Sequence, residues 1–239
     1  MGKDQLLFGR NILKEALSVR AEISKIYFEN ESSLAFAKDL LQSFKLKKSP
    51  EMKHGIPGEI SKLGHQGIAF STPHQFYEMN WNIEKDSYPF ILLCNHIEDV
   101  QNLGAITRSA AAFGVNMIVH EERRSVRVNA AAVKISAGQA FRMKFLEVAN
   151  LTPLCKKLTD AGYSVIGLDA GENCTDLFDW NPRFPLALVI GSESSGISKP
   201  VQGQLESLVK IPMRAEVESM NAANAASVAM AWVFKFLKN

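Results

Sequence analysis

Short, uninterrupted apolar runs recur through the last two-thirds of the chain, and they constrain the fold more than any other feature. Strands of a parallel sheet are buried on both faces and therefore read as continuous apolar runs. Here such runs alternate with helix-like segments, notably residues 102–113 and 222–237. This alternation is typical of an α/β fold with a mostly parallel sheet. The predicted strands are residues 90–94, 117–119, 145–148, 165–168, 186–190 and 208–211.

The first 75 residues show a separate pattern of shorter elements. Apolar residues recur at helical spacing from Ile12 to Leu17 and from Leu34 to Phe44, and residues 25–29 and 68–70 are strand-like. Residues 76–89 lose this periodicity and are rich in polar side chains, which is typical of a linker. We therefore expect a small N-terminal α/β domain at 1–75, a linker at 76–89 and a larger domain at 90–239.

Composition excludes some classes of protein without selecting a function. A formal net charge of +2 neither indicates nor excludes a local nucleic-acid-binding surface. Cys94, Cys155 and Cys174 are far apart and lack metal-ligand spacing, so we expect reduced thiols and no bound metal. No segment resembles a signal peptide or approaches the roughly 18 apolar residues of a membrane span. We therefore expect a cytoplasmic protein with no membrane partner.

Three polar segments follow predicted strands, where ligands bind in open α/β sheets. In the first, Asn102 is a candidate helix cap, and Gly104 and Arg108 are four residues apart on one helix face. The alternative is a capped helix with a surface arginine. After residues 186–190, the segment from Gly191 to Gly196 contains two glycines and a carboxylate. It is neither a phosphate-binding loop nor a dinucleotide fingerprint, and it could be an ordinary strand–helix turn.

The third segment runs from Ile211 to Asn221 and leads into the last predicted helix. Ser219 or Asn221 could cap that helix, whose first turns consist mostly of alanine. Small side chains allow another segment or a ligand to approach the backbone closely. A tightly packed core helix is equally compatible with this pattern.

Together, the order and spacing of these segments resemble the three motifs of the SpoU (TrmH-like) family of RNA ribose 2′-O-methyltransferases. The resemblance covers roughly residues 90–236. It departs from the family at Val100, where proline is usual, and at Met220, where leucine is usual. The matching residues are Asn102, Gly104 and Arg108, then Gly191, Glu193 and Gly196, then Ile211, Pro212, Ser219 and Asn221.

The N-terminal part is similar to the small RNA-binding domain of the bacterial 23S rRNA guanosine-2′-O-methyltransferases. The similarity rests on Gly9-Arg10 and His65-Gln66-Gly67. It favours rRNA as the substrate and leaves tRNA open. A non-enzymatic RNA-binding protein is a further alternative, against which the retained motif residues argue.

The resemblance implies a SPOUT-like C-terminal domain with a trefoil knot, a homodimer, and S-adenosylmethionine bound near the subunit interface. Arg108 is the implied catalytic residue. A guanidinium, with a pKa above about 12, is a poor base, so we expect Arg108 to stabilise developing negative charge or to anchor a phosphate. The other implied roles are donor binding by Ile190, Gly191, Gly196, Ile211 and Met220, orientation of the ribose and Arg108 by Asn102, Glu193, Ser219 and Asn221, and RNA contact by Arg10 and Arg124.

Overall fold

The computed structural model describes residues 4–46, 49–78, 81–83, 88–171, 173–193, 195–214, 216–217 and 219–237. By its internal contacts the chain forms two compact units. The first unit comprises Met1–Phe76 and Val128–Arg142, and the second comprises Tyr77–Arg127 and Met143–Asn239.

The first unit is built on a four-stranded sheet in the order β1-β4-β2-β3. β4 pairs antiparallel with β1 and β2, and β3 pairs parallel with β2. Helix α2 begins with a capping box, in which the Asn30 side chain accepts from the Ser33 backbone and Ser33 accepts in return. The elements are β1 (Gln5–Phe8), α1 (Arg10–Ser18), β2 (Lys25–Phe28), α2 (Glu31–Phe44), β3 (Glu51–His54), η1 (Gly58–Ile60), β4 (Ile68–Thr72), α4 (Ala130–Ile135) and η2 (Gln139–Arg142).

Residues 128–142 pack with the first unit, although the sequence pattern groups them with the predicted larger domain. Lys134 donates from Nζ to the carbonyl oxygen of Gly64 at 2.9 Å. Arg142 forms an ion pair with Glu15 of α1, with Nε 2.8 Å from Oε2. Gly138 has a φ of 86°, and a Cβ there would lie 2.8 Å from the Glu15 Cβ. These contacts join residues 70 or more positions apart, so local periodicity could not reveal them.

The second unit contains a seven-stranded sheet in the order β7-β6-β5-β10-β8-β11-β9. Within the described residues, every pair of neighbouring strands in it is parallel, which confirms the predicted α/β fold with a mostly parallel sheet. The strands are β5 (Phe90–Cys94), β6 (Met117–Glu121), β7 (Lys144–Val148), β8 (Ser164–Leu168), β9 (Thr175–Asp176), β10 (Leu186–Ile190) and β11 (Ser207–Lys210). The helices are α3 (Val100–Ala112), α5 (Leu151–Asp160), α6 (Lys199–Gln202) and α7 (Ala222–Phe234).

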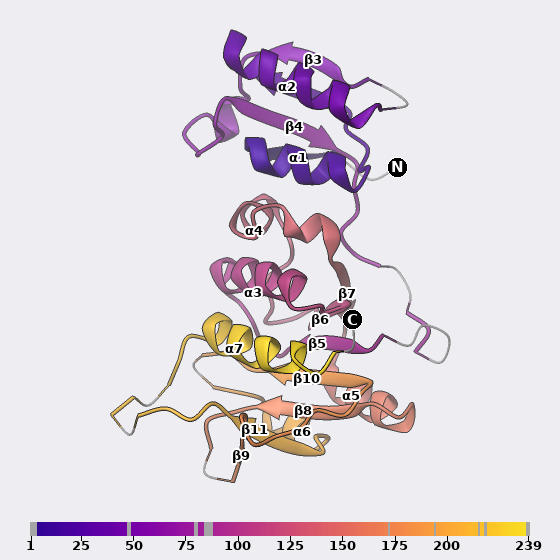
Figure 1. Ribbon diagram of the computed structural model, residues 1–239, viewed down its shortest axis with the longest axis vertical. Coiled ribbons are helices and arrows are strands. Elements are labelled where there is room, and N and C mark those ends of the chain that lie inside the picture. The colour runs from indigo at the N-terminus through magenta and orange to yellow at the C-terminus, as the bar shows by residue number, and fades with distance from the viewer. Residues whose placement is uncertain are drawn as a thin grey trace. The chain divides into compact units, whose positions relative to one another are not determined.

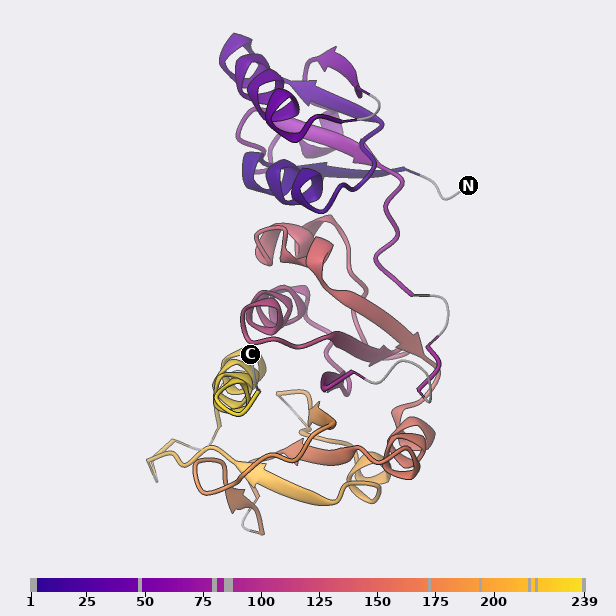
Figure 2. The same cartoon turned by 45° about the vertical axis from the view of Figure 1, so that its right-hand side comes forward.

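Helices cover both faces of this sheet, which explains the unbroken apolar runs. α3 and α7 lie on one side and α5 and α6 on the other (Figures 1 and 2). Alternate strand residues, such as Ile91 and Val189, pack in one core with Leu154 and Leu158 of α5. Their neighbours along each strand point to the opposite face. Within the described residues, no helix is long and apolar enough to span a membrane.

Candidate active site

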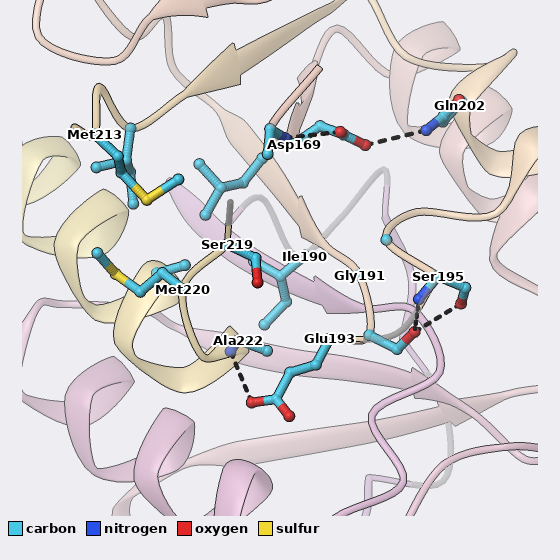
Figure 3. Close-up of a pocket in the computed structure, with 16 residues that line it drawn as sticks. Asp169, Ile190, Gly191, Glu193, Ser195, Gln202, Met213, Ser219, Met220 and Ala222 are labelled. Carbon is cyan, nitrogen blue, oxygen red and sulfur yellow. Dashed lines mark hydrogen bonds between the residues drawn. The ribbon is translucent and has the colours of Figure 1, made fainter. Parts of the chain in front are cut away.

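A cavity of about 400 Å³, here called the first cavity, opens where β8, β10 and β11 end (Figure 3). Its wall is formed by the residues that follow these strands and by the start of α7. A cavity of this size lies within the range for small-molecule sites. Its place at the carboxyl ends of parallel strands is where this class of sheet binds ligands.

The turn after β10 is held tightly by its own backbone. Ser192 donates its N–H to the Gly196 carbonyl at 3.2 Å, and the Gly196 N–H donates back at 3.0 Å. A Cβ on Gly191 would lie 2.1 Å from the Gly196 carbonyl carbon, closer than real Cβ atoms come to any such atom. Gly196 itself has a φ of 61°. Both glycines are therefore required by the turn that forms the cavity wall.

Carboxylates supply the charged groups among the described residues that line the first cavity. Asp169, directly after β8, accepts from the Ala170 and Gly171 N–H groups at 2.7 and 3.1 Å, and from Gln202 Nε2 at 3.1 Å. Glu193 is the second carboxylate (Figure 3). Two negative side chains in a concave site favour a cationic ligand. The sequence analysis did not identify Asp169 or Gln202, although an acidic residue at the end of a strand was a usable signal.

The start of α7 joins the three sequence segments. Asn221 caps α7, and its Oδ1 accepts from the Ala223 and Asn224 N–H groups at 3.0 and 3.2 Å. Its Nδ2 donates to Oδ1 of Asn102 at 2.9 Å and also to Glu193. Glu193 accepts from the Ala222 N–H at 3.2 Å as well. A carboxylate at a helix N-terminus is favoured by the helix dipole.

A second cavity, of about 300 Å³, lies beside the first. The two share Ser192, Glu193 and Ser195, so the turn after β10 separates them. The remaining residues that line the second cavity are His96, Ile97, Glu98, Asp99, Asn102 and Arg124. A ligand in the first cavity and a ligand in the second would therefore both lie beside Glu193.

Most of the predicted site residues are brought together. All five predicted donor-binding residues, Ile190, Gly191, Gly196, Ile211 and Met220, line the first cavity. Ser219 and Glu193 line it as well, whereas Asn102 and Arg124 line the second cavity.

Three predicted residues, Arg10, Arg108 and Asn221, do not line either cavity, although Asn221 is hydrogen-bonded to Asn102 and Glu193 of their walls. Arg108 is exposed on α3 and forms no hydrogen bond or ion pair with the described part of the chain. Arg10, in the first unit, donates from its backbone N–H to Gln66 Oε1 and from Nε to the Gln66 carbonyl, both at 3.1 Å. Its guanidinium carbon also lies 4.9 Å from the centre of the Phe36 ring. Arg10 thus has structural contacts whatever else it binds.

The thiols near the site are not activated. Burial raises the pKa of Cys94 to about 12. Burial, and then the negative charge of Asp169, raise the pKa of Cys174. A thiolate, not a thiol, is the nucleophile, so the raised pKa values disfavour nucleophilic catalysis by these cysteines. Among the residues that the structure describes, no group of three or more His, Cys, Asp or Glu side chains could hold a metal ion.

We expect Asn221→Ala to destabilise the second unit by about 1–2 kcal/mol, because a helix cap of this type is worth about that much. Urea unfolding measures the change in the free energy of unfolding. Asn224→Ala is the matched control, because Asn224 is exposed on the same helix. Equal stability of Asn221→Ala and the unsubstituted protein would contradict the capping role.

Comparisons with known proteins place this chain in a family. Residues 89–231, more than half of the chain, match the SpoU rRNA Methylase family. A protein of Staphylococcus haemolyticus named as a TrmH family tRNA/rRNA methyltransferase is 32% identical over 98% of this chain and 96% of its own length. A protein of Mycolicibacterium vanbaalenii named as an uncharacterized tRNA/rRNA methyltransferase is 32% identical over 95% of this chain and 75% of its own length.

Solved structures show the same fold. The SpoU methyltransferase AviRb from Streptomyces viridochromogenes, in complex with its cofactor AdoMet, aligns with a TM-score of 0.79 at 22% identity. The alignment covers 98% of this chain and 90% of that one. The chain therefore belongs to the SpoU methylase family of RNA methyltransferases, for which S-adenosylmethionine is the methyl donor.

Proposed function

We propose that this protein transfers a methyl group from S-adenosylmethionine to a ribose 2′-hydroxyl of structured RNA, and that its target is a guanosine of 23S rRNA. The observation that carries the proposal is the pair of adjoining cavities that share Glu193. The donor occupies the first cavity and the acceptor nucleotide the second. The relatives named above are called tRNA/rRNA methyltransferases, so a tRNA ribose is the second candidate.

The residues of the first cavity fit the donor. S-adenosylmethionine supplies an activated methyl group on a positively charged sulfur. Asp169 and Glu193 provide negative charge, and the glycine turn provides exposed backbone groups close to the ligand. In this proposal Ile190, Ile211 and Met220 contact the donor, and the segments that carry Gly191 and Met220 belong to a trefoil knot.

The chain's part in the reaction is to position and to stabilise charge. Asn102, Glu193, Ser219 and Asn221 orient the ribose. The hydrogen bonds that join Asn102, Glu193 and Asn221 at the start of α7 support this role for those three, because a connected network holds each side chain in one orientation. Arg108 stabilises negative charge that develops on the attacking oxygen. Because Arg108 is exposed and outside both cavities, we propose that it acts on the partner's site in a homodimer.

The first unit is proposed to bind RNA in the cytoplasm, with Arg10 as one contact and Arg124 of the second unit as another. The test is to map 2′-O-methyl groups on total RNA from cells with and without this protein. Purified protein should then restore the missing methyl group on that RNA in vitro. A methyl group on a base, or no change in ribose methylation, would contradict the proposal.

We expect Arg124→Ala to weaken RNA binding at every sequence tested and to lower the slope of log K against log salt by about 1, as loss of one phosphate contact does. Binding is measured at several salt concentrations. Arg183→Ala is the control, because Arg183 pairs with Glu206 on the surface and not at either candidate cavity. An unchanged salt slope for Arg124→Ala would remove this residue from the RNA contact.

A further inference from the structure

His96 occupies an unfavourable backbone conformation at the edge of the second cavity. It lies two residues after Cys94, the last residue of β5, and has a φ of 61°. Few residues other than glycine adopt this region, although Asn, Asp and His do so more often than most. Such backbone strain is found at functional sites more often than elsewhere. The His96 side chain is 21% exposed and lines the second cavity together with Asn102 and Glu193.

A buried carboxylate holds this imidazole. Nε2 of His96 lies 3.2 Å from Oε2 of Glu121, the last residue of β6, whose side chain is 10% exposed. The same Oε2 accepts from Nδ2 of Asn95 at 2.8 Å, and Oε1 accepts from the Leu151 N–H at 3.2 Å. Asn95 in turn accepts from the Ser198 N–H at 2.8 Å. Glu121 is therefore fixed by neighbours on separate elements.

A carboxylate beside one ring nitrogen selects the tautomer of a histidine. With the proton on Nε2, facing Glu121, the other ring nitrogen, Nδ1, is free to accept a proton. The same logic operates where a carboxylate orients a catalytic histidine in hydrolases. Here the oriented imidazole borders the cavity that we assign to the acceptor nucleotide.

We infer that His96 is the general base that accepts the proton of the ribose 2′-hydroxyl, and that Glu121 is its positioning residue. This inference rests on the proposed function. The 2′-oxygen forms a bond to the methyl carbon, the carbon–sulfur bond breaks with its electron pair returning to sulfur, and the hydroxyl proton passes to Nδ1 of His96. His96 then releases that proton to water, so charge and atoms balance.

The other charged groups beside His96's cavity or its ring are less suited to this role. Besides Glu121, they are Glu98, Asp99, Glu193 and Arg124, which line the same cavity. Asp99 caps α3, because its Oδ1 accepts from the Gln101 N–H at 2.9 Å, and Glu193 is engaged at the start of α7. Carboxylates ordinarily titrate near pH 4, whereas a general base works best when it titrates near the operating pH.

The experiment is the pH dependence of single-turnover methyl transfer at saturating donor and RNA. For the unsubstituted protein, the rate should rise roughly tenfold per pH unit and level off within the range of about pH 5 to 8 where histidine ordinarily titrates. His96→Asn and His96→Gly suit the left-handed backbone and should lower the plateau rate about 100-fold or more. Calorimetric binding of S-adenosylhomocysteine, which reports folding, should be unchanged.

Two further variants separate catalysis from structure. Added imidazole should restore part of the activity of His96→Gly. Glu121→Gln should lower the single-turnover rate and leave binding of S-adenosylhomocysteine unchanged, because the imidazole loses the carboxylate that orients it. Glu98→Gln, which removes a charge from the same cavity, is the matched control and should keep the profile of the unsubstituted protein.

The outcomes are distinguishable. Ribose methylation with the same pH profile in His96→Asn as in the unsubstituted protein would overturn the role of His96 and leave the proposed function standing. A rate for the unsubstituted protein that stays constant from about pH 5 to 8 would also overturn the role of His96, without any variant. Methyl transfer to a base instead of the ribose would overturn both the proposed function and this inference.

Discussion

Replacing Arg108 with alanine should lower the single-turnover rate of methyl transfer about 100- to 1000-fold, the usual cost of removing one group that stabilises transition-state charge. Affinity for S-adenosylhomocysteine should change little, because Arg108 lies outside the first cavity. Arg108→Lys keeps the positive charge but loses the planar guanidinium. A single-turnover rate for Arg108→Lys between those of Arg108→Ala and the unsubstituted protein indicates simple electrostatic stabilisation. Rates are measured at saturating RNA and donor, on variants shown to be folded.

Gln101→Ala is the matched control, because Gln101 is exposed on the same helix. Mixing Arg108→Ala with a second variant that cannot bind donor tests whether Arg108 acts across a dimer. If it does, mixed dimers regain one working site and activity returns. A near-normal rate for Arg108→Ala would remove the residue from the mechanism, and the alternative of a surface arginine on a capped helix would hold.

Gly191→Ala should greatly weaken donor binding and also destabilise the second unit. The added Cβ would stand 2.1 Å from the Gly196 carbonyl carbon and 2.4 Å from the Ile197 nitrogen, which are backbone atoms and cannot rotate away. Overpacking of this kind costs about 1–3 kcal/mol, or more where backbone must move. If this free-energy cost arises in the donor-bound conformation of the turn, the affinity for S-adenosylhomocysteine drops about 10- to 100-fold. Calorimetry with S-adenosylhomocysteine and thermal unfolding measure the two effects.

Gly171→Ala is the control for this substitution. Its Cβ would meet its nearest atoms at 3.7 and 3.8 Å, which is ordinary contact, although it lies in the turn that holds Asp169. We expect it to bind donor normally. If Gly191→Ala binds as tightly as the unsubstituted protein, the turn after β10 must be able to open, and its rigid geometry would not be what forms the donor site.

The sheet of the second unit could be predicted because each of its central strands is buried on both faces. Burial of every residue in β5, β6 and β10 leaves a local signal, an unbroken apolar run, that needs no knowledge of the partners. β9, with two residues, leaves no such signal and was not predicted. The residue at which each strand ends could be predicted from the same signal. These strand ends locate the region of the first cavity.

The motif residues that line the cavities were identifiable because the family resemblance preserves their order along the chain. The contacts of Asp169, His96 and Glu121 could not be identified from the sequence, because they depend on which strands are neighbours in the sheet. β5 and β6 are adjacent in the sheet, so His96 and Glu121, at successive strand ends, meet across that boundary. Asp169 meets Gln202 in the same way, through a helix that follows another strand.

The amino-acid sequence by itself determined the fold class, the burial of the sheet and the segments that form the site, since these follow from local apolar patterns and turn residues. The tertiary structure alone decided that residues 128–142 pack with the first unit, that two cavities share Glu193, and that Arg108 stands outside both. The physical reason is that strand order and helix docking are set by many weak, long-range packing contacts, and no short stretch of sequence encodes their sum.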